Sequence, residues 1–247
     1  MKRNISWLKY SLYQPILIVL VAAIFYLYDF FLRVSPSVIT QELMVFYDVG
    51  ANVLGPMLSS FFLAYTLMQI PSGLLGDRFG PRIILTIAAV LCSLATFLFV
   101  SYNYIGIGAI ARFLMGCCAS FAYIAPLMLA ARWFDAKYFA LVCGLIQMMG
   151  SLGAVIGGAP VVYFTEIYGW QKPLLWAAWL GLGLAVLFFL VIKDAPKNKK
   201  CSELKNLTTE SVKALWALKR VCHHKQSWAI GVIGFARIGH FTKLFNI

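Results

Sequence analysis

Charged residues are scarce in this sequence, and acidic ones are the scarcest. Asp, Glu, Lys and Arg together make up 12% of the 247 residues, with nine acids against 21 bases. Hydrophobic residues make up 62% of the chain, whereas soluble domains have roughly 45–50%. Because so little charge is available for a water-facing surface, the composition predicts an integral membrane protein.

The residue patterns of enzyme and metal sites are also missing. The six cysteines have no paired spacing that indicates a disulfide framework or a zinc site, and Cys222-His-His224 has no fourth ligand at a recognised spacing. The sequence contains no nucleophile–base constellation and no phosphate-binding glycine-rich loop. We therefore expect free thiols, no metal, no cofactor and no enzymatic activity.

Long apolar runs dominate what is present. A helix needs about 20 apolar residues to cross the hydrocarbon core of a bilayer. Six runs reach that length, and short connections join them: 15–38, 52–75, 82–101, 104–128, 139–164 and 173–192. The sequence therefore predicts an all-α integral membrane protein with a six-helix bundle over residues 1–192.

The bases in the connecting segments fall almost entirely on one side of these runs. The bases are Lys2, Arg3 and Lys9, then Arg78 and Arg82, then Arg132 and Lys137, then the run from 193 to 225. The opposite loops carry mainly acids: Glu42, Asp48 and Glu166. Since cytoplasmic loops are rich in Lys and Arg, this asymmetry predicts a multi-pass inner-membrane protein with its N-terminus in the cytoplasm. The formal charge of +12 is explained by topology, and no nucleic-acid partner is expected.

Two segments follow the six runs. Residues 193–226 are hydrophilic and basic, and 209–221 have the apolar spacing of an amphipathic helix, so we expect a cytoplasmic loop that lies on the membrane surface. Residues 227–247 begin as a seventh apolar run, which Arg237, His240 and Lys243 interrupt before it reaches spanning length. The sequence predicts a truncated seventh span here.

A short polar break separates the second and third runs: Gly73-Leu-Leu-Gly-Asp-Arg-Phe-Gly-Pro-Arg82. Gly80 suits a tight turn, and Pro81 suits the first position of the next helix, where its missing N–H costs nothing. Asp77, Arg78 and Arg82 favour a local ion-pair network at the membrane surface. An ordinary charged hairpin is the alternative interpretation.

This loop resembles the signature G-x-L-a-D-R-x-G-[RK]-[RK] of the major facilitator superfamily, with Pro81 replacing one base. The resemblance implies the N-terminal half of that fold, built from two inverted three-helix repeats, with a C-terminal half of similar size as its partner. It also implies that the loop helps to gate alternating access. The gating residues would be Gly73, Asp77, Arg78, Gly80 and Arg82.

Three ionisable residues interrupt the apolar runs, and each costs at least about 2.5–3.5 kcal/mol on insertion scales. Asp29 and Arg33 are four residues apart and so share one helix face. Arg112 lies at a similar predicted depth in the fourth run. In one interpretation Asp29 and Arg33 neutralise each other while Arg112 binds backbone carbonyls. In the other, the three form a site with a net positive charge, which favours an anionic or zwitterionic solute.

Arg112 and Gly116 resemble the fourth-helix R-x-x-x-G motif of the superfamily, and Arg33 resembles the first-helix arginine of its anion-transporting branches. The resemblance implies that both arginines bind a substrate carboxylate. Asp29 would then titrate with a coupling proton, while three residues would add hydrogen bonds to the substrate: Tyr26, Tyr123 and Gln147.

These features predict a secondary transporter, a proton-coupled symporter of a small organic anion or amino acid. The run 28–38 is similar to the phagosomal nutrient transporters of intracellular bacteria. One alternative is a non-functional membrane fragment of a disrupted transporter gene. Another is a drug or metabolite antiporter, which the order Gly157-Gly-Ala-Pro160 disfavours. The fifth-run glycines are otherwise interpreted as packing residues.

Overall fold

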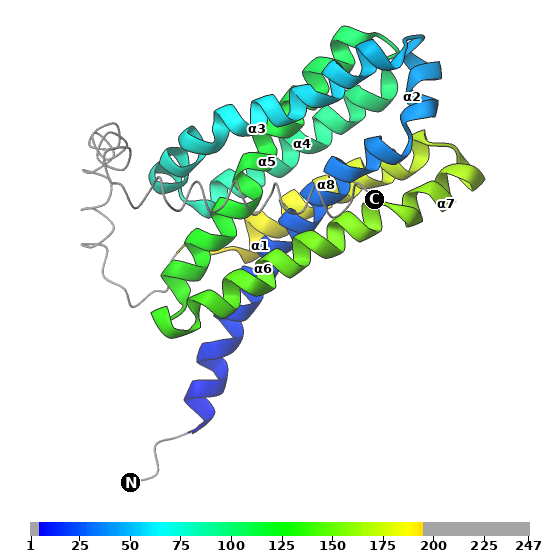
Figure 1. The fold of residues 1–247 in the computed structure, drawn as a ribbon. Helices are drawn as coiled ribbons and strands as arrows, with labels where there is room; N and C mark the ends of the chain where they lie inside the picture. Colours follow the sequence, from blue (N-terminus) through cyan, green and yellow to red (C-terminus); the bar gives the residue numbers. More distant parts are fainter. Residues whose placement is uncertain (1–4, 195–247) are drawn as a thin grey trace, which may run out of the picture. The chain divides into compact units, whose positions relative to one another are not determined.

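The structure, a computed structural model, describes residues 5–194 and the side chains from residue 13 onward. This part of the chain is entirely helical between its turns (Figure 1). The helices are α1 (Ile5–Val38), α2 (Thr40–Tyr47), α3 (Ala51–Phe79), α4 (Pro81–Ser101), α5 (Ile105–Trp133), α6 (Ala136–Gly157), α7 (Ala159–Tyr168) and α8 (Gln171–Val191). The predicted cytoplasmic loop and seventh span lie almost wholly outside the described residues.

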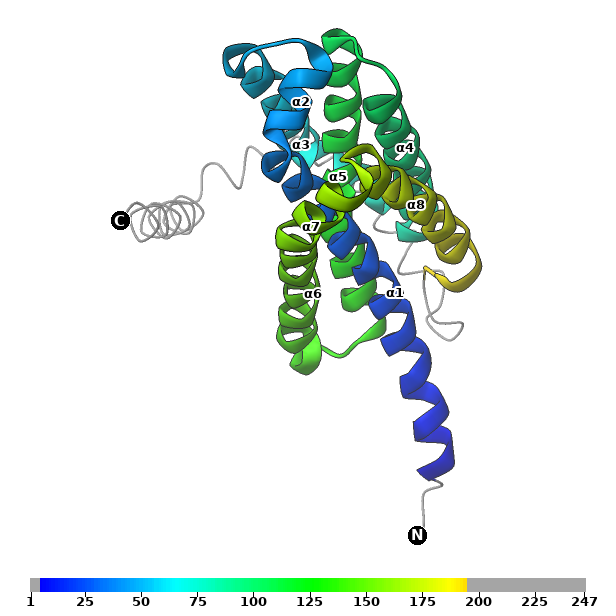
Figure 2. The ribbon, with the colours of Figure 1, turned by 90° about the vertical axis from the view of Figure 1, so that its right-hand side faces the viewer.

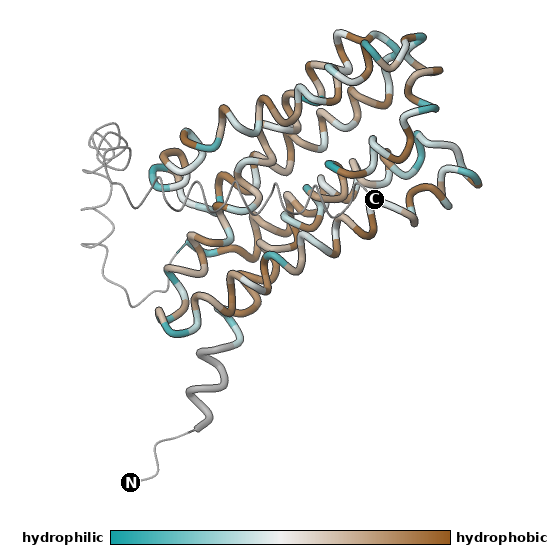
Figure 3. Tube along the Cα trace, viewed as in Figure 1, coloured by the Kyte–Doolittle hydropathy of each residue, from teal (hydrophilic) through white to brown (hydrophobic). Residues whose placement is uncertain are grey.

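The six predicted spans are confirmed. Six stretches are long and apolar enough to cross a membrane: Tyr13–Val38, Ala51–Phe79, Pro81–Ser101, Ile105–Trp133, Ala136–Tyr168 and Gln171–Val191. The fifth of them consists of α6 and α7, which meet at Gly158. Along the trace, hydrophobic residues prevail within the helices and hydrophilic ones gather near their ends (Figure 3).

Two details differ from the sequence prediction. Helix α3 continues one turn past the predicted end at 75, to Phe79. The loop residues stay helical up to the hydrogen bond of 3.1 Å that the Gly80 N–H donates to the Gly76 carbonyl. The loop after the first span contains the short helix α2. The Tyr47 hydroxyl donates a hydrogen bond of 2.8 Å to the Phe99 carbonyl, which ties α2 to the end of α4.

The spans pair in a pattern that repeats. The main contacts are α1 on α6, α3 on α5 and α4 on α8, with α5 also packed on α4 (Figures 1 and 2). The first span thus packs on the fifth, the fourth packs on the second, and the third packs on the sixth. If the first three spans are equivalent to the last three, the pair of the first and fifth spans corresponds to the pair of the fourth and second. The observed pairing is therefore the one that two equivalent three-helix repeats produce.

Glycines bring these helix pairs close together. A Cβ atom added at Gly153 or Gly157 would clash with the backbone of α1 at Leu27 or Phe31. On the other pair, a Cβ at Gly116 of α5 would overlap the Phe61 carbonyl of α3. The predicted packing role therefore holds for Gly153 and Gly157, because small residues let membrane helices approach backbone to backbone.

The polar loop forms the predicted turn. Gly80 has φ +81°, a conformation that favours glycine, and Pro81 is the first residue of α4. The Arg82 N–H donates a hydrogen bond of 2.8 Å to Asp194 Oδ1. The Arg82 guanidinium donates to the Phe189 carbonyl from Nε and Nη2, at 3.0 and 2.6 Å.

The predicted ion-pair network within this loop is absent from the described residues. Asp77 and Arg78 are exposed, and the guanidinium of Arg78 lies 5.4 Å from the Phe79 ring centroid. Exposed ion pairs gain little in water, whereas the last turn of α8 offers Arg82 carbonyl groups that lack helical partners. Arg82 therefore binds α8 instead of Asp77.

Candidate functional site

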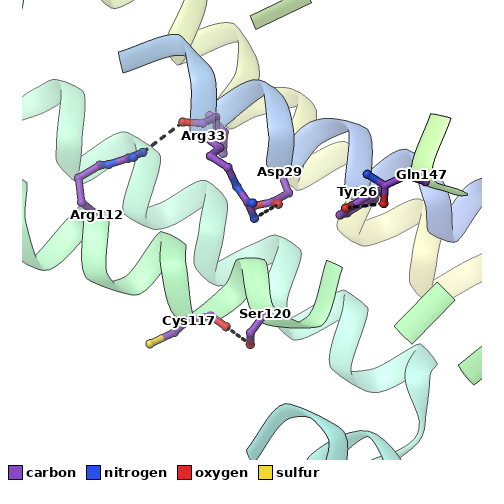
Figure 4. Close-up of polar contacts among 8 residues, drawn as sticks. Tyr26, Asp29, Arg33, Arg112, Cys117, Ser120 and Gln147 are labelled. Carbon is purple, nitrogen blue, oxygen red and sulfur yellow. Dashed lines mark hydrogen bonds and ion pairs between the residues drawn. The ribbon is translucent and has the colours of Figure 1, made fainter. Parts of the chain in front are cut away.

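The candidate site begins on α1, one to two turns before the helix ends at Val38. Arg33 Nη2 lies 2.9 Å from Asp29 Oδ2, so the predicted pair on one helix face is a hydrogen-bonded ion pair. The Asp29 side chain is 3% exposed and that of Arg33 is 17% exposed. Asp29 is thus shielded and Arg33 is partly exposed, and Figure 4 shows the two side chains pointing at each other.

Arg112 reaches the same place from α5. Its Nη1 donates a hydrogen bond of 3.1 Å to the carbonyl of Leu32, the neighbour of Arg33, as Figure 4 shows. Arg112 is 2% exposed and is the largest fully buried side chain in the described part of the chain. The two arginines therefore lie at the same level of the bundle, as the sequence predicts.

The charges of this cluster do not cancel. Within residues 13–194 Arg112 makes no ion pair, so two guanidinium groups face a single carboxylate. The Nε atoms of Arg33 and Arg112 are both buried and have no hydrogen-bond partner there. The contacts that the purely structural interpretation requires are thus present, since Arg33 binds Asp29 and Arg112 binds a backbone carbonyl. They still leave one positive charge without a counter-ion and two N–H donors without an acceptor in the described part of the chain.

Aromatic rings enclose the guanidinium groups. Phe61 of α3 lies against both, with its ring centroid 4.6 Å from Arg112 Cζ and 5.3 Å from Arg33 Cζ. Phe30 and Tyr65 add further contacts to Arg33, at 4.5 and 4.7 Å. Such contacts stabilise a cation in a desolvated place without neutralising it.

Sequence reasoning missed Phe61. A phenylalanine within an apolar run carries no local signal, since the chain has 19 of them. The one available hint is the glycine in R-x-x-x-G, which indicates that another helix approaches Arg112, but it does not say which helix does so.

The three predicted hydrogen-bonding residues form a second group around Tyr26, which lies one turn before Asp29 on α1. The Tyr26 hydroxyl donates to Gln147 Oε1 at 3.2 Å, and its ring centroid is 5.2 Å from that of Tyr123. Tyr26 is buried, whereas Gln147 is exposed on α6 (Figure 4). Tyr26 and Asp29 are three residues apart on α1, so the two groups share a helix face.

The predicted gating residues, Gly73 to Arg82, do not belong to this site. They occupy the end of α3 and the start of α4, whereas Asp29 and Arg33 lie in the last third of α1, whose C-terminal end is at the other end of the bundle (Figure 1). The described residues contain no group of three or more His, Cys, Asp or Glu side chains that would suit a metal ion. Two guanidinium groups with unpaired N–H donors have the chemistry to accept an anion.

Comparison with known proteins agrees with this architecture. The profile of the Major Facilitator Superfamily matches residues 17–245. The uncharacterized transporter YybO of Bacillus subtilis is 25% identical over 226 residues, 87% of this chain and 52% of that protein. The probable sulfoacetate transporter SauU of Cupriavidus necator is 24% identical over 164 residues, 66% of this chain and 38% of that one.

The nitrate/nitrite transporter NrtP of Nostoc punctiforme is 28% identical over 162 residues, 59% of this chain and 31% of that protein. Among solved structures, a bacterial homolog of the human lysosomal transporter Spinster superposes with a TM-score of 0.65 at 17% identity, over 75% of this chain and 44% of that one. The chain thus spans about half the length of the first relative. The helix pairing, the loop and the matched profile together establish that this chain belongs to the Major Facilitator Superfamily and corresponds to the N-terminal half of its fold.

Proposed function

We propose that the complete protein is a secondary transporter of a small anion and that this chain contributes one half of its binding site. The observation that carries the proposal is the buried Arg112, which has no carboxylate partner in the described part of the chain and lies beside Arg33. Keeping an uncompensated charge in a membrane protein is costly, so such residues are rare and mark solute pathways. A bound anion would offset this cost and use the two unpaired Nε donors.

The names of two relatives support an anionic substrate, since one is a probable sulfoacetate transporter and another a nitrate/nitrite transporter. We infer a small organic anion, because paired guanidinium groups match the geometry of a carboxylate or a sulfonate. An amino acid is the second candidate. Its carboxylate would use the same arginines.

We further propose that Asp29 couples transport to protons. An ionised Asp29 holds Arg33 in the 2.9 Å ion pair. Protonation of Asp29 would remove that partner and release the Arg33 guanidinium for a substrate anion. Proton and anion would then favour each other's binding, so the two would be bound, and carried, together. Tyr26, Tyr123 and Gln147 would bind the remaining polar groups of the solute.

Lysine substitutions of the two arginines test the proposal. Arg33→Lys and Arg112→Lys keep the charge but lose the planar fork, so each is expected to weaken sulfoacetate affinity at least about tenfold. Titration calorimetry measures this on the chain purified together with a matching six-span C-terminal half. Arg82→Lys is the matched control, since Arg82 binds α8 outside the site. Wild-type affinity in both site variants, or an equal loss in the control, would refute the proposed role.

The proposal includes an orientation: an inner-membrane protein whose N-terminus, 73–82 loop and 193–226 segment are cytoplasmic, the loop acting as a gate. Single cysteines introduced at positions 48, 168 and 200 test this in intact cells with a membrane-impermeant maleimide. Labelling is expected at 48 and 168, because the positive-inside rule places them outside. Position 200 is expected to label only after permeabilisation, and the unsubstituted chain sets the background. Labelling of position 200 in intact cells would contradict the proposed orientation.

A further inference from the structure

Phe61 occupies a special place in the arginine cluster, because its ring contacts both guanidinium groups. We propose that Phe61 is a positioning residue that holds Arg33 and Arg112 as a pair able to bind one anion. This inference rests on the proposed anion-binding function and adds to it a determinant of affinity. Phe61 is 1% exposed, so its ring contacts protein atoms rather than lipid.

The position of the ring follows from a glycine. Arg112 and Gly116 are four residues apart on one face of α5. Because Gly116 has no side chain, the Phe61 carbonyl of α3 occupies the space where a Cβ would lie. This close approach of the two backbones inserts the Phe61 ring beside Arg112 and within reach of Arg33 on α1.

The chemistry of the ring explains why a phenylalanine suits this place. Two guanidinium groups repel each other, and in a buried site that repulsion is only weakly screened. The negative face of an aromatic ring attracts both cations. A carboxylate here would also hold them, but it would neutralise the pair and remove its attraction for a solute. The ring therefore stabilises two positive charges while the Nε–H groups of both stay unpaired.

Tyr65, one turn after Phe61 on α3, extends the same aromatic wall. Its ring is nearly parallel to that of Phe61, with an interplanar angle of 5° and centroids 6.5 Å apart, and it covers Arg33 at 4.7 Å. The Arg33 guanidinium is thus held by rings on one side and by Asp29 on another. If Asp29 is protonated, the rings remain as the groups that keep Arg33 in place, so Phe61 matters most when the substrate binds.

The test compares phenylalanine variants of the full chain, each paired with a matching six-span C-terminal half, by titration calorimetry with sulfoacetate. Phe61→Leu is expected to weaken affinity about tenfold, because the contacts with both cations are lost, while Phe61→Tyr, which keeps the ring, is expected to stay within about threefold. Phe62→Leu is the matched surface control, since Phe62 is the next residue and is 52% exposed. Phe25→Leu is the buried control, since Phe25 packs on Phe188. Equal affinity in Phe61→Leu and wild type, or an equal loss in Phe25→Leu, overturns the proposal.

A second measurement separates this inference from the proposed function. Aromatic rings shift the nuclear magnetic resonance signals of protons above their faces, so the Hε signals of Arg33 and Arg112 are expected to move in Phe61→Leu and not in Phe62→Leu. The Arg→Lys variants assign the two signals. If the wild-type chain, paired with that C-terminal half, binds neither sulfoacetate nor nitrate, the proposed function fails and the affinity role of Phe61 fails with it, while moved signals still establish the positioning. Signals unchanged in Phe61→Leu overturn the positioning itself.

Discussion

Vesicles that contain only residues 1–247 are expected to show no proton-driven anion uptake. The reason lies in the exposed faces of two spans. In the apolar stretch of α3, only 22% of the residues are buried, and the same share is buried in the span formed by α6 and α7. Their exposed faces carry polar side chains within the membrane-spanning region: Ser59, Thr66 and Gln69 on α3, and Gln147 and Ser151 on α6.

The faces of α4 and α8 are different. Their exposed residues inside the membrane are apolar, for example Ile87, Leu91 and Leu94 on α4 and Leu180 and Val186 on α8. Lipid suits these residues, whereas polar groups that face hydrocarbon are unfavourable. We infer that α3 and α6 are covered by further protein in the functional transporter. Without that cover, the arginine cluster could not be closed off from lipid or opened alternately to the two sides of the membrane.

The measurement is uptake of labelled sulfoacetate into vesicles under an imposed pH gradient. Empty vesicles set the background, and co-expression of the chain with a matching six-span C-terminal half is expected to raise uptake above it. In that pair, Asp29→Asn is expected to abolish the dependence on the gradient. Saturable uptake by a monomeric chain would contradict the prediction, and chemical crosslinking would show whether any such uptake comes from a dimer that closes the cavity.

Gly153→Leu is expected to remove most of the folded protein from the membrane. A side chain at this position would overlap the Leu27 carbonyl, which is backbone and cannot move aside as a flexible side chain does. Overpacking of a core costs about 1–3 kcal/mol, and a separation of α6 from α1 would add the loss of a whole helix contact. The expected result is a lower membrane yield and a lower thermal midpoint in detergent.

Gly144→Leu is the matched control, because it makes the same change on the same helix. A Cβ at Gly144 would meet no atom within 4 Å. Leucine also has a better helix propensity than glycine, so this variant is expected to keep the wild-type yield and midpoint. Equal losses of yield and midpoint in the two variants would mean that α6 needs glycine for its backbone conformation and not for its close packing on α1.

Local patterns allowed much of this protein to be predicted from its sequence. The six spans follow from apolar length, because a helix in lipid satisfies its own backbone hydrogen bonds and needs little information from distant residues. The turn at Gly80 and Pro81 follows from backbone geometry alone. The Asp29–Arg33 pair follows from a spacing of four residues, which puts both side chains on one helix face.

Contacts between residues far apart in the chain were decided by the tertiary structure. Arg82 binds the end of α8 rather than its neighbour Asp77, because surface ion pairs are weak and α8 offers unpaired carbonyls. Arg112 binds the Leu32 carbonyl, and the Phe61 ring contacts both guanidinium groups, where Gly116 lets α3 and α5 touch. The sequence by itself determined which residues carry charge into the membrane. Helix packing, which depends on how side chains of different helices fit together, decided that these charges meet around an aromatic ring.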